Sequence, residues 1–289
     1  MVGAVDIGTN SMRLLITDGV VELGRWVEVT GLGSGIDATG RLADDAIGRT
    51  ISVLGRYGAL MDDRNVGARK AIATSASRDA SNRDSFFDQA EAALGVRPTL
   101  ITGDEEARLA YLGATSEEVN DQPLLVSDIG GGSTEFVTSH GSVSVDIGSV
   151  RLTERALPER PPSEDNLSAA RELVLAQFAG VDVGPVRTLV GVAGTWTSLG
   201  AMALGLPSYD RDLVHGTTLT RDGLEDLIGN LASMSVEETA TIPSLDPKRA
   251  PVILAGAVVA AAVLDSVGVG EATISERDTL DAVAAELLA

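Results

Sequence analysis

Two stretches of the chain share one pattern of apolar strand, glycine turn and apolar strand. They read VGAVDIGTNSMRLLIT at residues 2–17 and LLVSDIGGGSTEFV at residues 124–137. In each, an apolar run reaches an aspartate and a glycine, a small polar turn follows, and a second apolar run begins. Apolar runs on both sides of a glycine turn predict two short strands joined as a hairpin.

The two stretches align with a constant offset of 122 positions. The identical pairs are Asp6 and Asp128, Ile7 and Ile129, Gly8 and Gly130, and Ser11 and Ser133. Such a repeat predicts two similar half-molecules, each with one hairpin loop. Because 289 residues exceed a comfortable single core, we expect two domains, residues 1–120 and 121–289. The last predicted helix is a candidate to pack back on the first domain.

The rest of the hydrophobic pattern alternates between strand and helix. In the first half, strand patterns cover residues 20–29, 66–74 and 98–101, and helical spacing covers residues 42–61, 83–94 and 107–114. In the second half, strand patterns cover residues 142–147, 188–192 and 272–274, and helical spacing covers residues 150–156, 163–178, 194–204, 221–234, 236–241, 250–267 and 280–288. This order predicts an α/β fold with a mixed five-stranded sheet in each domain.

Two local signals indicate where predicted elements begin and end. Asn82 precedes the helix at 83–94 and is its predicted N-cap. The polar segment 116–123 ends in proline, which predicts a linker.

Three glycines, residues 130–132, permit positive φ and a close approach of backbone N–H groups to a ligand. Together with Asp128 and Ser133 this turn suits a phosphate, and the alternative is a glycine-rich hairpin without a ligand.

Composition narrows the classes of function. The net charge of −20 disfavours nucleic acid and anionic membranes as partners. The absence of cysteine excludes disulfides and thiolate chemistry. The chain has only two histidines, which argues against a histidine-rich metal site. A catalytic metal would then be a hard cation such as Mg²⁺, held by carboxylates and substrate oxygens.

No signal peptide is evident, and the longest apolar run, residues 252–264, is too short to span a bilayer. We therefore expect a soluble, cytoplasmic protein.

Five stretches, in this order, resemble the exopolyphosphatase / guanosine pentaphosphate phosphohydrolase (Ppx/GppA) phosphatase family: AVDIGTNSMRLLI, IATSASR, ITGDEEARLAYLGA, VSDIGGGSTEF and VAGTWTSL. The resemblance covers essentially the whole chain. The family belongs to the actin-like ATPase and sugar kinase superfamily. The resemblance therefore implies two ribonuclease-H-like domains with an active site in the cleft between them.

The resemblance also implies roles for individual residues. The two phosphate-binding loops would comprise Gly8, Asn10 and Ser11 in the first copy and Gly130, Gly131, Gly132 and Ser133 in the second. Arg78 matches the family's phosphate-contacting arginine, and Glu106 its proposed catalytic base. Asp6 or Asp128 would anchor Mg²⁺, with Mn²⁺ as the other cation to consider. Arg13, Arg108 and His215 are weaker candidates.

Hydrolysis of a phosphoanhydride needs an aligned water and neutralisation of the phosphate oxygens, so these roles are chemically coherent. The plainer interpretations are that Glu105 and Glu106 stabilise a helix N-terminus and that Arg78 forms a surface salt bridge. Longer family members carry a helical domain with a His-Asp pair, and neither His140 nor His215 is followed by Asp. Without that domain we expect a preference for short polyphosphate chains.

Exopolyphosphatase activity on inorganic polyphosphate is thus the leading hypothesis. The alternatives are hydrolysis of guanosine pentaphosphate (pppGpp) to remove its 5′-phosphate, a superfamily kinase, and a non-catalytic sensor of polyphosphate or alarmones. An aromatic content of 3% offers few surfaces for a guanine base, which favours polyphosphate. The family often forms homodimers, so a homodimer is the one protein partner that the resemblance implies.

Overall fold

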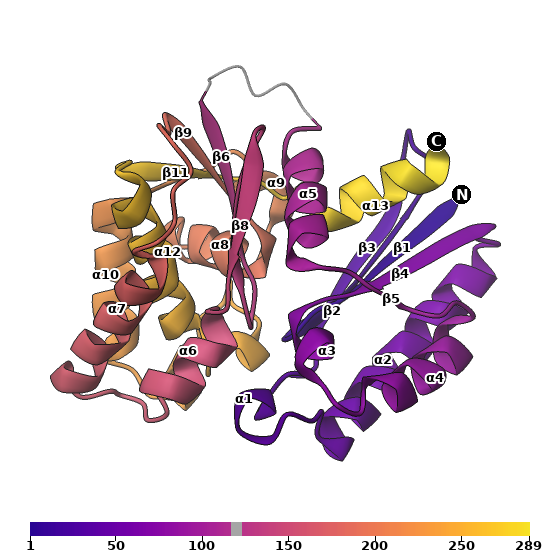
Figure 1. Cartoon of the computed structure of the whole chain (residues 1–289), viewed down its shortest axis with the longest axis horizontal. Helices are drawn as coiled ribbons and strands as arrows, with labels where there is room; N and C mark the ends of the chain where they lie inside the picture. Colours follow the sequence, from indigo (N-terminus) through magenta and orange to yellow (C-terminus); the bar gives the residue numbers. More distant parts are fainter. Residues whose placement is uncertain (117–122) are drawn as a thin grey trace. The chain divides into compact units, whose positions relative to one another are not determined.

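The computed structural model describes residues 1–116 and 123–289. The chain forms two compact units, and residues from Asp278 to Ala289 belong to the first unit while the second ends at Arg277. Most of the predicted linker at 116–123, and the predicted boundary after residue 120, fall outside the described residues. The fold class expected from the hydrophobic pattern is confirmed, since each unit contains a mixed sheet with helices (Figure 1).

The first unit contains a five-stranded sheet in the order β3-β2-β1-β4-β5. Its strands are β1 (Val2–Ile7), β2 (Ser11–Thr17), β3 (Glu22–Val29), β4 (Ala68–Ala73) and β5 (Thr99–Leu100). Its helices are α1 (Ile36–Thr39), α2 (Asp44–Asp63), α3 (Ser75–Asp79), α4 (Arg83–Leu94), α5 (Gly103–Ala114) and α13 (Thr279–Leu288). Strand β1 runs antiparallel to β2 and parallel to β4. The carboxyl ends of β1 and β4 therefore lie side by side.

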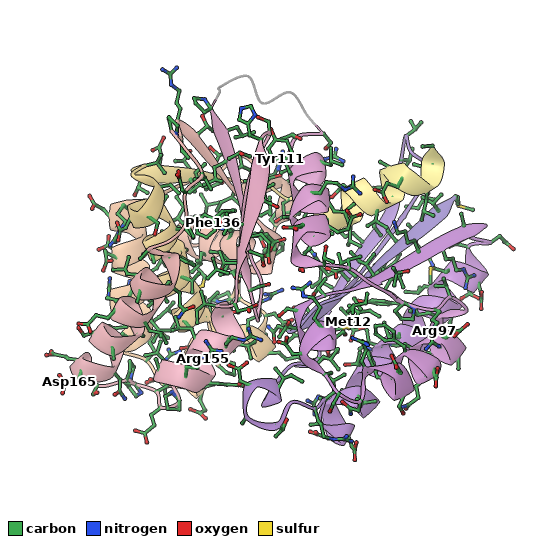
Figure 2. All side chains as sticks on the ribbon, viewed as in Figure 1. Met12, Arg97, Tyr111, Phe136, Arg155 and Asp165 are labelled. Atoms are coloured by element: carbon green, nitrogen blue, oxygen red, sulfur yellow. The ribbon has the colours of Figure 1, made fainter. Side chains whose placement is uncertain are left out.

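Strand β1 is buried on both faces, and its side chains alternate between two cores. Val5 and Ile7 join the cluster that includes α2 and α4. Met12 of the neighbouring strand β2 belongs to this cluster and is fully buried (Figure 2). Val2 and Ala4 point to the other face, in the cluster with α5 and α13. Asp6 follows the same alternation and so lies on the α5 and α13 face.

The C-terminal helix α13 packs on α5 and on strands β1, β2 and β4. Leu280 and Val283 of α13 are fully buried in the same cluster as Leu109 of α5. This burial explains why the last residues of the chain return to the first unit, because without α13 that face of the sheet would expose its apolar side chains.

The second unit contains a six-stranded sheet in the order β10-β11-β9-β6-β7-β8. Its strands are β6 (Leu124–Ile129), β7 (Thr134–Thr138), β8 (Gly141–Val145), β9 (Thr188–Val192), β10 (Thr218–Thr220) and β11 (Glu271–Ile274). Its helices are α6 (Ser149–Ala156), α7 (Glu164–Phe178), α8 (Ala193–Ala203), α9 (Arg211–Val214), α10 (Arg221–Ala232), α11 (Val236–Thr239), the 3-10 helix η1 (Pro247–Arg249) and α12 (Ile253–Val267).

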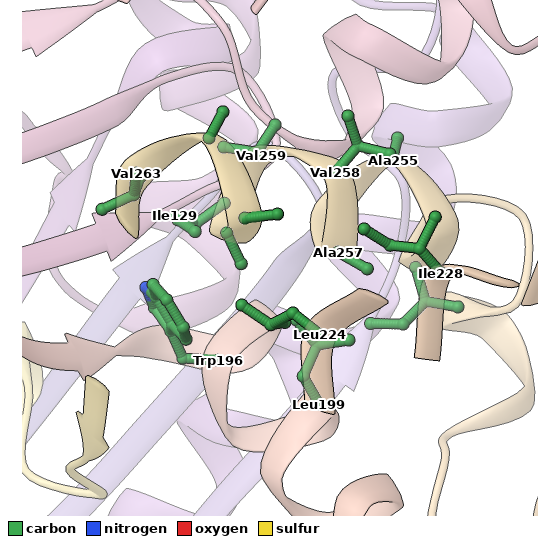
Figure 3. Close-up of a cluster of buried hydrophobic side chains, with 14 of the residues drawn as sticks. Ile129, Trp196, Leu199, Leu224, Ile228, Ala255, Ala257, Val258, Val259 and Val263 are labelled. Carbon is green, nitrogen blue, oxygen red and sulfur yellow. The ribbon is translucent and has the colours of Figure 1, made fainter. Parts of the chain in front are cut away.

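Helix α12 is the centre of the second core. Its residues from Ile253 to Leu264 are all buried, and it packs against α6, α7, α8, α10 and β6. Figure 3 shows Val258, Val259 and Val263 of this helix in the cluster that also holds Trp196 and Ile129. An apolar helix of this length that is covered on every side is a core element, as predicted for residues 250–267. No helix in the described ranges is long and apolar enough to cross a membrane.

The repeat seen in the sequence extends to the topology. In both units a three-stranded antiparallel meander, β1-β2-β3 or β6-β7-β8, is joined through its first strand to a parallel strand. Strands β1 and β6 begin and end 122 positions apart.

Two predictions about this architecture are wrong in detail. The second sheet has six strands instead of five, because the short segment Thr218–Thr220 pairs antiparallel with β11. Asn82 precedes α4, but its side chain makes no cap and instead bonds the backbone N–H and carbonyl of Leu42. Within the described residues, the glycines with positive φ do not include Gly130, Gly131 or Gly132.

Candidate active site

The two hairpin loops have the same backbone turn. The amide of Gly8 donates to the carbonyl of Ser11 at 3.1 Å, and the amide of Gly130 donates to the carbonyl of Ser133 at 3.0 Å. These pairs are related by the offset of the repeat. The glycines are needed for space, since a Cβ on Gly8 would lie 2.9 Å from the Ser11 carbonyl oxygen.

In the second unit, helix α6 holds the carbonyls of the glycine loop. The amide of Ser149 donates to the Gly130 carbonyl at 3.0 Å, and the amides of Val150 and Arg151 donate to the Gly131 carbonyl at 2.9 and 3.1 Å. In a trans peptide the N–H points opposite to the carbonyl. The amides of Gly131 and Gly132 are therefore directed away from α6, as an anion-binding loop requires.

In the first unit, the loop after Thr30 has the equivalent role. The amide of Gly33 donates to the Thr9 carbonyl at 2.8 Å, and the amides of Thr30 and Gly31 donate to the Asn10 carbonyl at 2.9 and 3.0 Å. The N–H of Asn10, in the peptide bond after Thr9, is thereby directed away from this loop. The side-chain amide nitrogen of Asn10 is buried without a hydrogen-bond partner. A buried donor without a partner is costly, so it marks a position where a ligand oxygen would be bound.

Asp6 is tied to an arginine on the neighbouring strand. It is directly opposite Arg13 in the register of β1 and β2, and the Nε of Arg13 donates to Asp6 Oδ2 at 2.8 Å. The Nη2 of Arg13 donates to the same oxygen, and its Nη1 donates to Asp278. The other oxygen of Asp6, Oδ1, is buried without a partner. Burial raises the pKa of Asp6 above its usual range, and Arg13 opposes that rise.

Arg78 and Glu106 form an ion pair on the same side of the sheet. Arg78 lies in α3, which begins directly after β4, and its Nη1 donates to Glu106 Oε2 at 2.8 Å and to the Ile101 carbonyl at 3.1 Å. Glu106 is in the first turn of α5, and only 13% of its side chain is exposed. Burial raises the pKa of Glu106, with Arg78 opposing and the charge of Asp6 adding to the rise. Asp6, Arg78 and Glu106 thus form one electrostatic cluster.

The adjacent Glu105 has a different environment. It is more exposed and pairs with Arg108 through two hydrogen bonds of 2.8 Å. These bonds lower its pKa. Glu105 therefore matches the plainer interpretation of a surface ion pair, whereas Glu106 is buried beside Arg78.

In the second unit, Asp128 is directly opposite a carboxylate that the sequence interpretation missed. Its register partner on β7 is Glu135, and both side chains are buried. Opposed residues of an antiparallel pair point to the same face of the sheet. Glu135 Oε1 accepts a hydrogen bond from Ser144 at 2.8 Å. The repeat relates Glu135 to Arg13, so this position could have been found by extending the alignment beyond the loops.

The predicted residues thus fall into two groups. The first unit brings together Asp6, Arg78 and Glu106 beside the loop of Gly8, Asn10 and Ser11. The second unit places Asp128 at the strand end before the loop of Gly130, Gly131, Gly132 and Ser133. Arg13, a weaker candidate in the sequence, is engaged on three nitrogens by Asp6 and Asp278.

Comparison with known proteins identifies relatives over nearly the full chain. A model described as the Ppx/GppA phosphatase family matches residues 20–279. Exopolyphosphatase 2 of Mycobacterium tuberculosis is 39% identical over 312 aligned positions, which cover 99% of this chain and 98% of that protein.

Two solved structures are similar along their whole length. The Ppx/GppA family member of Aquifex aeolicus is 32% identical, with a TM-score of 0.82 and coverage of 99% of this chain and 97% of that one. An exopolyphosphatase from Cytophaga hutchinsonii is 25% identical, with a TM-score of 0.89 and coverage of 99% and 97%.

Proposed function

Because the chain belongs to the Ppx/GppA phosphatase family, we propose that it is an exopolyphosphatase that releases orthophosphate from the ends of inorganic polyphosphate. The observation that carries the proposal is the buried Glu106 carboxylate, held by Arg78 in the same unit as the Asn10 loop. Relatives that are named exopolyphosphatases support the choice of substrate.

Glu106 is the proposed general base. It accepts a proton from a water molecule while the water oxygen bonds to the terminal phosphorus. The bond between that phosphorus and the bridging oxygen breaks, and the shortened chain leaves with the electron pair. Burial favours proton uptake by this carboxylate, because it raises the pKa of Glu106 above its usual range.

Arg78 has two tasks in this proposal. Its Nη1 donates to Glu106 and to the Ile101 carbonyl, so it orients the carboxylate and is itself held by the backbone. A guanidinium has five N–H groups, so Nε and Nη2 are left to bind phosphate oxygens. Charge on the transferred phosphoryl group would be neutralised there, as is usual in phosphoryl transfer.

Each unit has its own proposed phosphate-binding groups. In the first unit they are the amide of Asn10 and the hydroxyl of Ser11, and in the second the amides of Gly131 and Gly132 and the hydroxyl of Ser133. Backbone amides recognise phosphate without reading a base or a sugar. This property suits a polymer of identical phosphates.

Buried carboxylates in each unit fit Mg²⁺, with Mn²⁺ as the other candidate. In the first unit, Asp6 has a buried oxygen without a partner. In the second unit, Asp128 and Glu135 are opposed on one face of the sheet. Mg²⁺ is usually held by one or two carboxylates together with substrate oxygens and water, so the carboxylates of either unit are sufficient as its protein ligands. When bound, the cation would neutralise phosphate charge.

The proposal is tested by measuring orthophosphate release from tripolyphosphate, long-chain polyphosphate and guanosine pentaphosphate side by side. We expect polyphosphate to be preferred, and tripolyphosphate over long chains at equal concentration of chain ends, because a net charge of −20 repels a long polyanion. Preference for guanosine pentaphosphate would favour the other activity of the family. ADP formation from ATP only in the presence of a small alcohol would indicate a kinase instead, and binding without turnover would indicate a sensor.

A further inference from the structure

We propose that Asp278, at the start of the C-terminal helix, is a positioning residue that acts through Arg13 on Asp6. The inference rests on the proposed function, and it concerns a residue 265 positions from Arg13 in the chain. It follows from the contacts of Arg13, from the way Asp278 is held, and from the oxygen of Asp6 that these contacts leave without a partner.

Arg13 is held from two sides. Its Nε and Nη2 donate to Asp6 Oδ2, and its Nη1 donates to Asp278 Oδ2. The three side chains are 14%, 5% and 11% exposed. A guanidinium fixed by two carboxylates cannot rotate without breaking a buried charge-assisted hydrogen bond.

Asp278 is itself rigidly placed. Its Oδ1 accepts from the amide of Leu280 at 2.9 Å and its own amide donates to Asp281 Oδ2 at 2.9 Å, which together form the N-terminal cap of α13. Its carbonyl is packed against Gly113 of α5, where a Cβ would lie 1.9 Å from the Asp278 oxygen. Since α5 also carries Glu106, Asp278 connects the helix of the proposed base with the strand pair of Asp6.

The consequence for Asp6 is a defined orientation. Arg13 occupies Oδ2, and Oδ1 remains as the buried acceptor without a partner. When a carboxylate binds a cation or a water through one oxygen, a hydrogen bond to its second oxygen fixes its orientation. Hydrogen-bond partners of metal ligands have this effect in general. Loss of the Asp278 charge would remove the bond that α13 makes to Nη1 of Arg13 and would loosen Asp6.

The Asp278→Asn variant removes the charge that faces Arg13 and keeps the cap, because asparagine is as good an N-cap as aspartate and has the same shape. It also removes a weaker pair with Arg25, at 3.8 Å. The matched control is therefore Asp281→Asn, which removes the carboxylate that pairs with Arg25 at 2.7 Å and keeps an oxygen that can accept from the Asp278 amide. Turnover of tripolyphosphate and the rise in melting temperature caused by Mg²⁺ with inorganic phosphate are measured for both. The second readout needs no turnover.

We expect Asp278→Asn to lower kcat by about 10-fold and to reduce the ligand-induced rise in melting temperature, while Asp281→Asn changes neither, on the scale of outer-shell substitutions. In an Arg13→Met background the Asp278 substitution should cause no further fall in kcat or in the ligand-induced rise in melting temperature, because the contact of Asp278 with Asp6 through Arg13 is already lost. Equal losses in the two asparagine variants, or full additivity with Arg13→Met, would overturn the inference.

Two further outcomes are also informative. If Asp278→Asn does not fold, Arg13→Lys replaces it. Lysine keeps the charge but lacks the planar guanidinium, whose separate nitrogens donate to Asp6 and to Asp278 in a fixed geometry. A folded Arg13→Lys protein with wild-type turnover and ligand response would overturn the inference, and loss of both would support it. If the wild-type protein lacks phosphatase activity, the proposed function fails, and the melting-temperature comparison still decides the role of Asp278.

Discussion

Substitution of Gly148 by alanine tests whether the glycine loop must be held by α6. A Cβ on Gly148 would lie 2.6 Å from the Gly130 carbonyl oxygen and 2.7 Å from the carbonyl carbon and oxygen of Gly131. The backbone of Gly148 has φ −148° and ψ −173°, which alanine adopts without strain, so the penalty comes from this contact alone.

The expected losses of stability and activity follow from the 2.6 Å distance between the added Cβ and the Gly130 carbonyl oxygen. Ordinary contacts begin at 3.4 Å, so helix and loop must separate by about 0.8 Å. Overpacking of this kind costs about 1–3 kcal/mol of stability. The amides of Gly131 and Gly132 would move with their carbonyls, and a misplacement near 1 Å lowers kcat/KM by up to about 100-fold.

The assay compares orthophosphate release and thermal unfolding with those of Gly141→Ala. Gly141 lies in β8 of the same unit, and an added Cβ there meets no heavy atom within 4 Å. We expect the control to retain its activity and the Gly148 variant to lose most of it while it remains folded at the assay temperature. A folded Gly148→Ala protein with wild-type kcat/KM would refute the role of the loop amides.

Three further predictions address the base, the metal and the core. Arg78→Gln removes the charge that opposes the raised pKa of Glu106, so the acidic limb of the kcat/KM profile should move to higher pH. An unmoved limb would contradict the assignment of Glu106 as the base. Glu135→Gln should raise the Mg²⁺ concentration for half-maximal activity by about 10-fold, measured by metal titration after chelation, and an unchanged midpoint would exclude Glu135 as a ligand. Leu254→Ala, in the buried part of α12, should lower the free energy of unfolding in urea by about 2–5 kcal/mol without a change in KM. A smaller loss would mean that α12 is packed less tightly.

The elements with a strong local pattern could be predicted from the sequence. The strand Thr188–Val192 and the helix Arg83–Leu94 have the predicted bounds, because an apolar run between polar segments and a regular helical spacing are local properties. The strand Thr218–Thr220 was missed, since three residues with a single apolar position carry no periodic signal. It is a strand because β11 offers it an edge.

The site was only partly predictable for a similar reason. The loops and Glu106 lie in contiguous motifs, whereas the Arg13 contact with Asp278 joins residues at opposite ends of the chain. The glycines of the second loop permit positive φ, but in the structure the loop amides are oriented by hydrogen bonds from α6 to the loop carbonyls. Such bonds depend on tertiary packing and leave no trace in a local pattern.

The central claim is that Glu106 is the base of a phosphoanhydride hydrolase, and Glu106→Gln tests it most directly. Glutamine keeps the size of the side chain and an oxygen that can accept from Arg78, but it cannot take a proton from water. Polyphosphate binding and orthophosphate release should be measured on the same preparation. We expect binding to be retained and kcat to fall by about 100- to 10,000-fold. Turnover equal to that of the wild-type protein would contradict it.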